Sequence, residues 1–213
     1  MRTFARGLSA SNPEKWFENN RVNIPGVKEV IWEPLYDSAV YPLAGSTSIV
    51  FFQDQIGKNG KTLSDTNMEL DGQLSKGKVF LITGIQIAFY PGNGSNSLGT
   101  GMGQTLVRDV EAFSKGGALI LRIQSKEYLR QAPLGKFPPC ERISGDATVY
   151  GQNVVPSTTQ YAVTSGREFA VRQMLLESNQ NFTVELVSLP ALPSGLNGRL
   201  VVTLNGYTAR NAQ

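Results

Sequence analysis

Apolar and polar residues alternate through several short segments of this 213-residue chain, and turn residues separate these segments. The clearest segment is 78–90, in which five apolar residues share one parity: Val79, Leu81, Ile85, Ile87 and Phe89. Because successive side chains of a strand point to opposite faces, this parity predicts that all five lie on one face. Gly84 falls in the middle of this long segment, where we predict a bulge or bend.

The same kind of pattern predicts further strands at residues 27–33, 48–53, 118–124, 147–151, 160–163, 182–186 and 199–207. Residues 167–177 fit either a strand or a helix. Residues 104–114 show helical spacing instead, with apolar side chains on one side of the helix: Leu106, Val107, Val110 and Phe113. We therefore expect about eight strands with one or two short inserted helices.

These strands fit one domain of the all-β class. Hydrophobic residues make up 40% of the chain and the net charge is only +3, a balance that disfavours disorder. Long loops, predicted at 91–103 and 129–145, favour a single jelly-roll sandwich over a meander barrel. We place this sandwich at residues 27–213 and an N-terminal arm at residues 1–26, with a short helix predicted over 14–17.

Two residue counts restrict the chemistry available to the chain. It contains no histidine and a single cysteine, Cys140. These counts exclude a Ser-His-Asp triad, a Cys-His pair, a histidine-ligated metal site and an intrachain disulfide. We predict no catalytic residues, no metal and no cofactor, and hence no enzyme. A hydrolase that uses carboxylates is the alternative that these counts leave open.

Four short motifs of the sequence are candidate sites. Residues 57–62 (GKNGKT) lack the glycine that a phosphate-binding loop requires five residues before Gly60, so they predict a polar hairpin loop. Residues 99–103 (GTGMG) fail the dinucleotide fingerprint and predict a surface loop. Two carboxylate pairs are candidates for glycoside hydrolysis, and the second fits the solvent face of the predicted helix: Asp65 with Glu69, and Asp109 with Glu111.

Aromatic and basic residues near the N-terminus give the remaining candidates. Trp16, Phe17, Trp32 and Tyr36 are candidates for stacking on a sugar or a base, although such aromatics more often pack in a core or a subunit contact. Arg2 and Arg6 of the predicted arm are candidates for contact with a neighbouring subunit or with packaged nucleic acid, and a solvated tail is the alternative. Binding through so few charges would be weak, non-specific and sensitive to salt.

A family resemblance is carried by two parts of the chain. The first includes Thr66-Asn67-Met68, Gly72-Gln73-Leu74, Gly77 and Val79-Phe80-Leu81-Ile82. The second is residues 177–186 (ESNQNFTVEL), followed by 198–206 (GRLVVTLNG), Arg210 and Gln213. Together, over roughly 62–90 and 175–213, the chain resembles the jelly-roll capsid proteins of small icosahedral bacterial viruses, namely tailless phages that contain lipid or single-stranded DNA.

This resemblance implies a single jelly roll, since two stacked jelly rolls usually need a longer chain. It implies a virion structural protein, a capsid subunit that self-assembles into an icosahedral shell. The expected partners are copies of itself and other virion proteins, and the expected location is the virion, assembled in the host cytoplasm. The alternative is a carbohydrate-binding β-sandwich module of a phage tail or fibre. The sequence shows no secretory leader, and no apolar run reaches the length of about 18 residues that predicts a membrane span.

Overall fold

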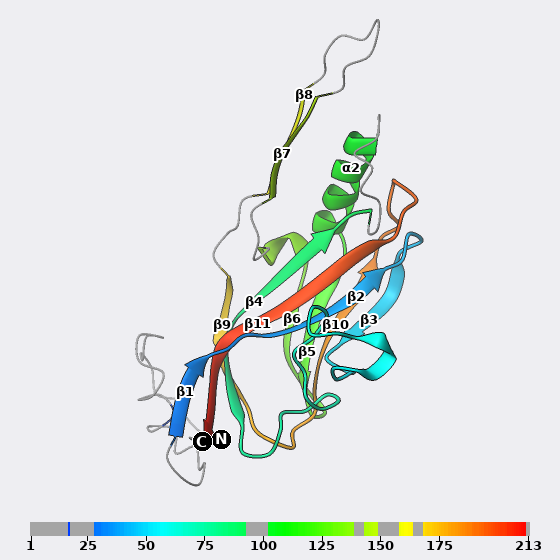
Figure 1. Cartoon of the computed structure of the whole chain (residues 1–213). Helices are drawn as coiled ribbons and strands as arrows, with labels where there is room; N and C mark the ends of the chain where they lie inside the picture. The colour runs from blue at the N-terminus through cyan, green and yellow to red at the C-terminus, as the bar shows by residue number, and fades with distance from the viewer. Residues whose placement is uncertain are drawn as a thin grey trace, which may run out of the picture.

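Antiparallel strands make up most of the computed structural model, which describes residues 17, 28–92, 102–138, 143–148, 158–163 and 168–211. The strands are β1 (Lys28–Trp32), β2 (Leu35–Tyr41), β3 (Ser46–Phe51), β4 (Val79–Tyr90), β5 (Ala118–Ile123), β6 (Lys126–Gln131), β7 (Ile143–Thr148), β8 (Thr158–Val163), β9 (Phe169–Leu176), β10 (Phe182–Leu189) and β11 (Gly198–Asn211). One α-helix, α2 (Met102–Lys115), and two short 3₁₀ helices, η1 (Lys58–Gly60) and η2 (Leu134–Lys136), complete the described elements (Figure 1).

The strands form two main sheets, which are the two layers of a β-sandwich. Sheet A has the order β1-β11-β4-β9, and β2 also pairs with β11. β1 and β2 pair with successive halves of β11 and are interrupted at Glu33 and Pro34, where proline cannot donate a backbone hydrogen bond. Sheet B has the order β3-β10-β5-β6. The all-β sandwich that the sequence predicts is therefore confirmed.

The strand pairs are nested along the chain. If β1 and β2 are counted as one interrupted strand, the first of the eight sandwich strands pairs with the last, β2 with β11. The second pairs with the seventh, β3 with β10, and the third with the sixth, β4 with β9. The innermost pair is β5 with β6. Each of these pairs is antiparallel, and the four pairs are distributed evenly over the two sheets.

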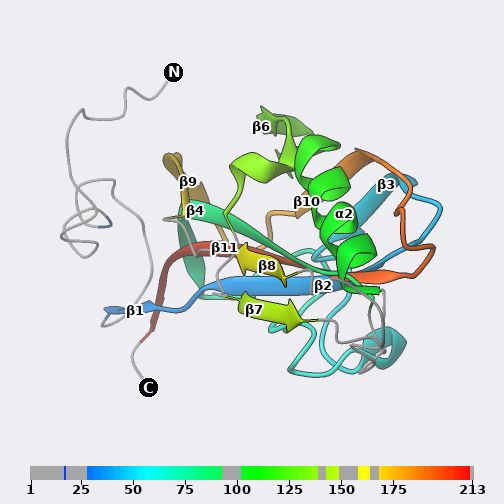
Figure 2. The same ribbon diagram turned by 90° about the horizontal axis from the view of Figure 1, so that it is seen from above.

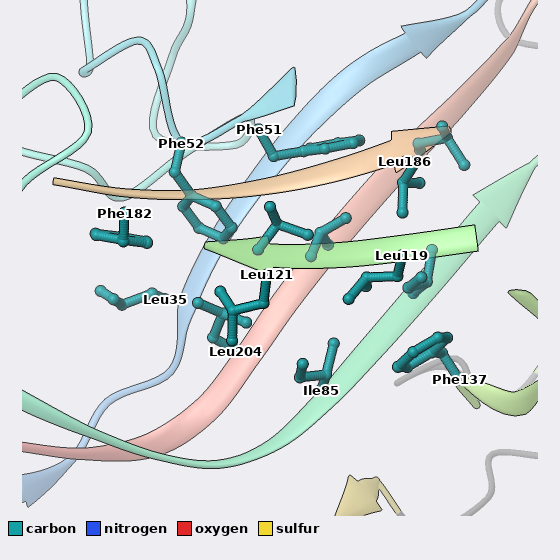
Figure 3. Close-up of a cluster of buried hydrophobic side chains, with 14 of the residues drawn as sticks. Leu35, Phe51, Phe52, Ile85, Leu119, Leu121, Phe137, Phe182, Leu186 and Leu204 are labelled. Atoms are coloured by element: carbon teal, nitrogen blue, oxygen red, sulfur yellow. The ribbon is translucent and has the colours of Figure 1, made fainter. Parts of the chain in front are cut away.

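The core lies between the two sheets and draws side chains from both (Figure 3). Leu35, Ile85 and Leu204 project from sheet A towards Leu121 and Phe182 of sheet B. The helix predicted at 104–114 is confirmed as α2, which covers the end of the sandwich (Figure 2). There Phe113 stacks on Phe89 with ring centroids 4.8 Å apart and meets the edge of Tyr41.

Strand β4 changes face part-way along its length. Asn205 of β11 pairs with Gly84 and Gly206 pairs with Ile82, so Thr83 is an extra residue of β4. This β-bulge confirms the irregularity predicted at Gly84. A bulge shifts the side-chain parity by one, and this shift makes part of the sequence prediction wrong. Ile85, Ile87 and Phe89 do share a face, but Phe80 and Ile82 join them in the main core, whereas Val79 and Leu81 point to the opposite face.

The residues on that opposite face form a second apolar cluster. Val79, Leu81 and Ala209 are buried there beneath Phe17, whose side chain is only 1% exposed. Partly buried apolar side chains surround this cluster: Val30, Leu175 and Tyr207. Phe17 is the described residue of the predicted arm, so part of residues 1–26 packs on the outer face of sheet A. The short helix predicted over 14–17 falls outside the described residues except at Phe17, which is helical.

Several other predictions need correction. The described residues contain eleven strands rather than about eight, because β2, β6 and β9 add to the expected set. The strands predicted at 147–151 and 160–163 correspond to β7 and β8, which begin at Ile143 and Thr158. The predicted loop 129–145 is wrong at both ends, since β6 continues to Gln131 and β7 begins at Ile143. The ambiguous segment 167–177 forms strand β9. β6 was missed because its sequence, KEYLRQ, belongs to an exposed edge strand with little apolar signal.

The bulge gives a direct stability test. A Cβ atom at Gly206 would lie 2.0 Å from the backbone oxygen of Leu81, so Gly206→Ala forces the two central strands apart. We expect this variant to lose about 3 kcal/mol of unfolding free energy in a urea titration. The matched control is Gly195→Ala, where φ is +67° and no atom lies within 4 Å of the new Cβ. There only left-handed strain remains, about 1 kcal/mol. Equal losses of unfolding free energy in the two variants would contradict the close approach of Gly206 to the Leu81 backbone.

Candidate functional site

Residues 52–78, which we call loop 52–78, connect β3 to β4 and run along the free edge of β2. The backbone N–H of Tyr36 donates to Asn67 Oδ1 at 2.9 Å, and Asn67 Nδ2 donates to the carbonyl of Pro34 at 2.8 Å. The N–H of Asn67 also donates to the carbonyl of Tyr36. One asparagine therefore covers the interruption between β1 and β2, and the loop occupies the edge of β2.

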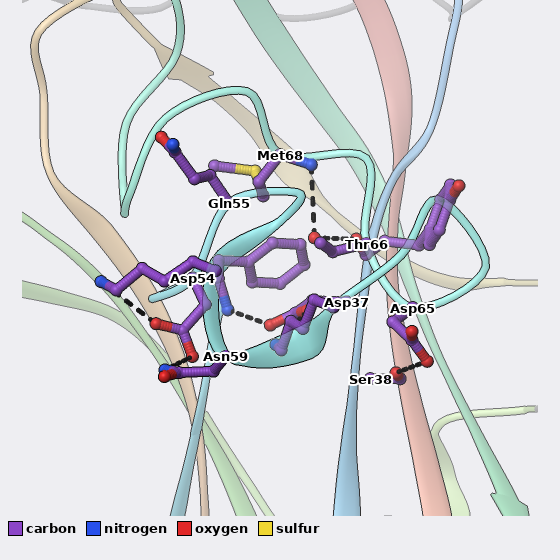
Figure 4. Close-up of polar contacts among 12 residues, drawn as sticks. Asp37, Ser38, Asp54, Gln55, Asn59, Asp65, Thr66 and Met68 are labelled. Carbon is purple, nitrogen blue, oxygen red and sulfur yellow. Dashed lines mark hydrogen bonds and ion pairs between the residues drawn. The ribbon is translucent and has the colours of Figure 1, made fainter.

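A buried carboxylate anchors this loop from inside the sandwich (Figure 4). Asp37 of β2 is fully buried, and its Oδ2 accepts the N–H of Phe52 at 2.6 Å. Its Oδ1 pairs with Lys61 Nζ, also at 2.6 Å. Lys61, the second lysine of the GKNGKT motif, thus neutralises the buried Asp37. Residues 58–60 of that motif form the exposed turn η1. The predicted hairpin loop is replaced by a 3₁₀ turn that is tied to the core.

The first candidate carboxylate pair is held in two separate ion pairs. Asp65 accepts the N–H and hydroxyl of Thr62 and pairs with Arg199 at 3.1 Å, and the hydrogen bond from the Thr62 N–H is the main reason that the pKa of Asp65 is lowered. Glu69 pairs with Lys78 at 2.6 Å, which lowers its pKa through a charged hydrogen bond. A glycosidase needs one carboxyl group with a raised pKa as its general acid. This pair does not supply that group.

The second candidate pair is divided between core and surface. Asp109 was expected on the solvent face of the helix, but the structure buries it completely, and its Oδ1 accepts the N–H of Ser194 at 2.8 Å. The prediction was wrong because α2 packs across the end of the sandwich, where the 190–195 turn covers its polar side. Glu111 lies exposed and pairs with Lys115 one turn later. The two carboxylates therefore do not face a common site.

The predicted aromatic platform is only partly brought together. Trp32 ends β1 with its side chain 66% exposed and pairs across the sheet with Tyr207. Tyr36 lies beyond the Pro34 interruption and donates its hydroxyl to the carbonyl of Leu63, and burial is the main cause of its raised pKa. Trp16, Arg2 and Arg6 fall outside the described residues, as does Cys140.

Most of the large exposed apolar side chains belong to one stretch of the chain. Seven of the eight large ones among the described residues fall between residues 32 and 70: Trp32, Val40, Leu43, Val50, Ile56, Leu63 and Leu70. We call this set the apolar side. Its members lie on β1, on β2 and the turn that follows it, on β3 and in loop 52–78. The eighth residue, Tyr128, lies on β6, the opposite edge strand of sheet B.

Charged groups near the apolar side are largely paired within the chain. Lys58 contacts Asp54 at 3.2 Å and Asp71 at 2.6 Å. On the outer face of sheet B, Glu185 accepts a hydrogen bond from the Ser48 hydroxyl at 2.5 Å and pairs with Arg122. These contacts lower the pKa of Glu185, with the Ser48 hydrogen bond as the main cause. The apolar side therefore combines exposed hydrophobic residues with internally neutralised charge.

Neither Asp37 nor the apolar side was predicted from the sequence. The sequence does hold a signal for the burial of Asp37. Leu35, Asp37, Ala39 and Tyr41 share one parity in residues 35–41, and an acid in such a row marks a buried charge that needs a partner.

In the part of the chain that the structure describes, no group of three or more Cys, Asp or Glu residues could hold a metal ion, and no helix is long and apolar enough to cross a membrane. Comparison with family models, curated proteins and solved structures gives no match. The candidate site therefore rests on the geometry of this chain alone, and the apolar side is its most distinctive surface.

The Asp37–Lys61 pair gives a test of how loop 52–78 is held. Lys61→Met leaves the Asp37 carboxylate buried without its cation, so we expect a loss of about 3 kcal/mol in unfolding free energy, measured by urea titration. Lys58→Met is the matched control, because its partners lie in solvent and its loss should be much smaller. Equal stability of Lys61→Met and the wild type would show that the buried pair does not anchor the loop.

Proposed function

We propose that this protein is a virion structural protein, a capsid subunit that self-assembles into an icosahedral shell. The nested strand pairing supports the fold that the proposal needs, and the exposed apolar surface supports the function. Eight sandwich strands, paired first with last and so on inwards, describe one long antiparallel hairpin wrapped into two sheets of four. We infer that this is a jelly roll, an architecture that recurs in viral capsid proteins.

The resemblance in sequence coincides with the strands that this topology needs most. Residues 62–90 include β4, and residues 175–213 include β10 and β11. β4 and β11 are the central strands of sheet A, while β10 lies inside sheet B. The resembling residues 79–90 and the second segment thus include framework strands of the sandwich, whereas residues 62–78 lie in loop 52–78, which covers the edge of β2.

The surface supports assembly rather than chemistry. Jelly rolls also occur in lectins and cupins, so the fold does not select among these functions and the surface must. Charged residues make up 17% of the chain, below the usual value of about 25%. The cores of protein interfaces are rich in apolar side chains, and the apolar side has this property. Its charged groups are numerous, but most of them are paired within the chain. The proposed partners are copies of this chain and other virion proteins.

The arm and the location complete the proposal. Phe17 on the outer face of sheet A shows that part of the predicted arm packs on the sandwich. Under the proposal, Arg2 and Arg6 at the start of that arm contact a neighbouring subunit or make weak, non-specific contact with packaged nucleic acid. The protein would then reside in the virion after assembly in the host cytoplasm, and it would carry out no reaction.

A second candidate function has one observation in its favour. Trp32 is 66% exposed and lies beside Tyr207, which is the kind of aromatic surface on which sugars stack. This supports a carbohydrate-binding module of a phage tail or fibre. If it is correct, added glycans shift the tryptophan fluorescence of the wild type, and Trp32→Ala abolishes the shift while Trp16→Ala retains it. An unchanged spectrum across a glycan panel contradicts this candidate.

Self-association is the direct test of the capsid proposal. We expect purified protein to form large homo-oligomers as concentration rises, because the apolar side lowers its exposure by contact with other copies. Sedimentation velocity and negative-stain imaging across salt and pH measure this. Monomers alone at high concentration under all conditions would overturn the proposal.

A further inference from the structure

The two edge strands of sheet B have opposite chemistry. β6 has the sequence KEYLRQ and carries Lys126, Glu127 and Arg130, the kind of charged residues that keep an edge strand from pairing with another chain. β3 has the sequence STSIVF and contains no charge, no proline and no glycine. Its register with β10 is unshifted from Ser46 to Phe51, although Thr47 and Ser188, whose φ is +57°, are not paired. β3 therefore lacks the features that natural proteins use to block edge pairing.

The free side of β3 is accessible and presents its backbone. Thr47, Ser48 and Val50 are exposed, and Val50 is 45% exposed. The N–H of Ser48 donates to the hydroxyl of Ser46 at 3.2 Å, and that hydroxyl donates to the Ser48 carbonyl at 2.9 Å. The Ser48 peptide groups thus face away from β10, and a pairing strand would replace the Ser46 hydroxyl as their partner. Because backbone direction alternates along a strand, those of Val50 face the same open side.

Neighbouring edges are occupied or protected. The edge of β2, on the same side of the sandwich, is covered by loop 52–78 through Thr66 and Asn67. β9, the other edge of sheet A, carries Arg172 and pairs with β4 through an irregular register. Among the described strands of the two sheets, β3 is the edge that remains open, uncharged and regular.

We propose that β3 pairs antiparallel with β3 of a second copy across a two-fold axis, which joins two four-stranded sheets into one of eight strands. A second copy is the occupant because an uncharged edge offers no complement to a charged partner, and nearby charges such as Glu185 and Asp54 already have partners. Two identical edges related by a two-fold axis exchange equivalent donors and acceptors, so each edge satisfies the other. Val50 and the rest of the apolar side then flank the pair.

This inference rests on the proposed self-assembly and adds the contact that would nucleate it. The test variant is Val50→Lys. Val50 pairs across the sheet with Glu185, so lysine keeps a favourable neighbour in the monomer while it places two like charges at the two-fold contact. The matched control is Tyr128→Lys, which puts the same charge on the exposed opposite edge, β6.

Sedimentation velocity on the full chain should show at least a tenfold rise in the dimer dissociation constant for Val50→Lys and no change for Tyr128→Lys. Hydrogen exchange of the wild type should show amides of residues 46–51 protected in the associated state and those of 126–131 unchanged. The exchange measurement uses the wild type, so it tests the pairing even if the variant folds poorly.

The edge pairing is wrong if the wild type associates while the amides of 46–51 exchange freely, or if Tyr128→Lys is the impaired variant. Self-assembly would still stand in either case. If the wild type never associates, both are overturned.

Discussion

The pairing of β4 with β11 is the contact on which the rest of the structure depends. These two strands lie at the centre of sheet A and are its longest, and the extra residue Thr83 divides their shared length in two. On one side of the bulge, Ile85 and Ile87 face the core between the sheets. On the other side, Leu81 and Val79 face outwards and bury Phe17. A single pair of strands thereby supports both the sandwich core and the attachment of the N-terminal segment.

Much of this could be predicted from the sequence, because alternation is a local signal. The strands centred on residues 85, 121 and 184, and helix α2, are set by their own residues and were located correctly. The sheet face of Val79 and Leu81 was predicted wrongly. A bulge changes the face on which the following side chains lie without changing the alternation seen in the sequence. Edge strand β6 was not predicted because most of its side chains are exposed, so its sequence shows little alternation of apolar and polar residues. The burial of Asp109 depends on the turn at 190–195, some 80 residues later along the chain, which no local pattern indicates.

The candidate site differs from the core in what determines it. Loop 52–78 has few regular elements, and its position follows from polar contacts between distant residues, above all Asp37 with Lys61 and Asp65 with Arg199. Such pairs are invisible to periodicity, because each partner alone looks like an ordinary surface charge. The burial of Asp37 shows that the pair it forms with Lys61 fixes the loop. The exposed Leu63 and Ile56 therefore belong to a loop whose backbone is fixed by these contacts.

Protection of sheet edges links this architecture to assembly. A sandwich has four edges, and each unprotected edge is a hazard for uncontrolled pairing. Here loop 52–78 covers β2, charges protect β6 and an irregular register disrupts β9, while β3 keeps a regular and neutral edge. Pairing of β3 with itself across a two-fold axis is closed, because it consumes both edges and leaves none to propagate a fibre. Under the proposed pairing, protection of the other three edges leaves β3 as the one specific contact.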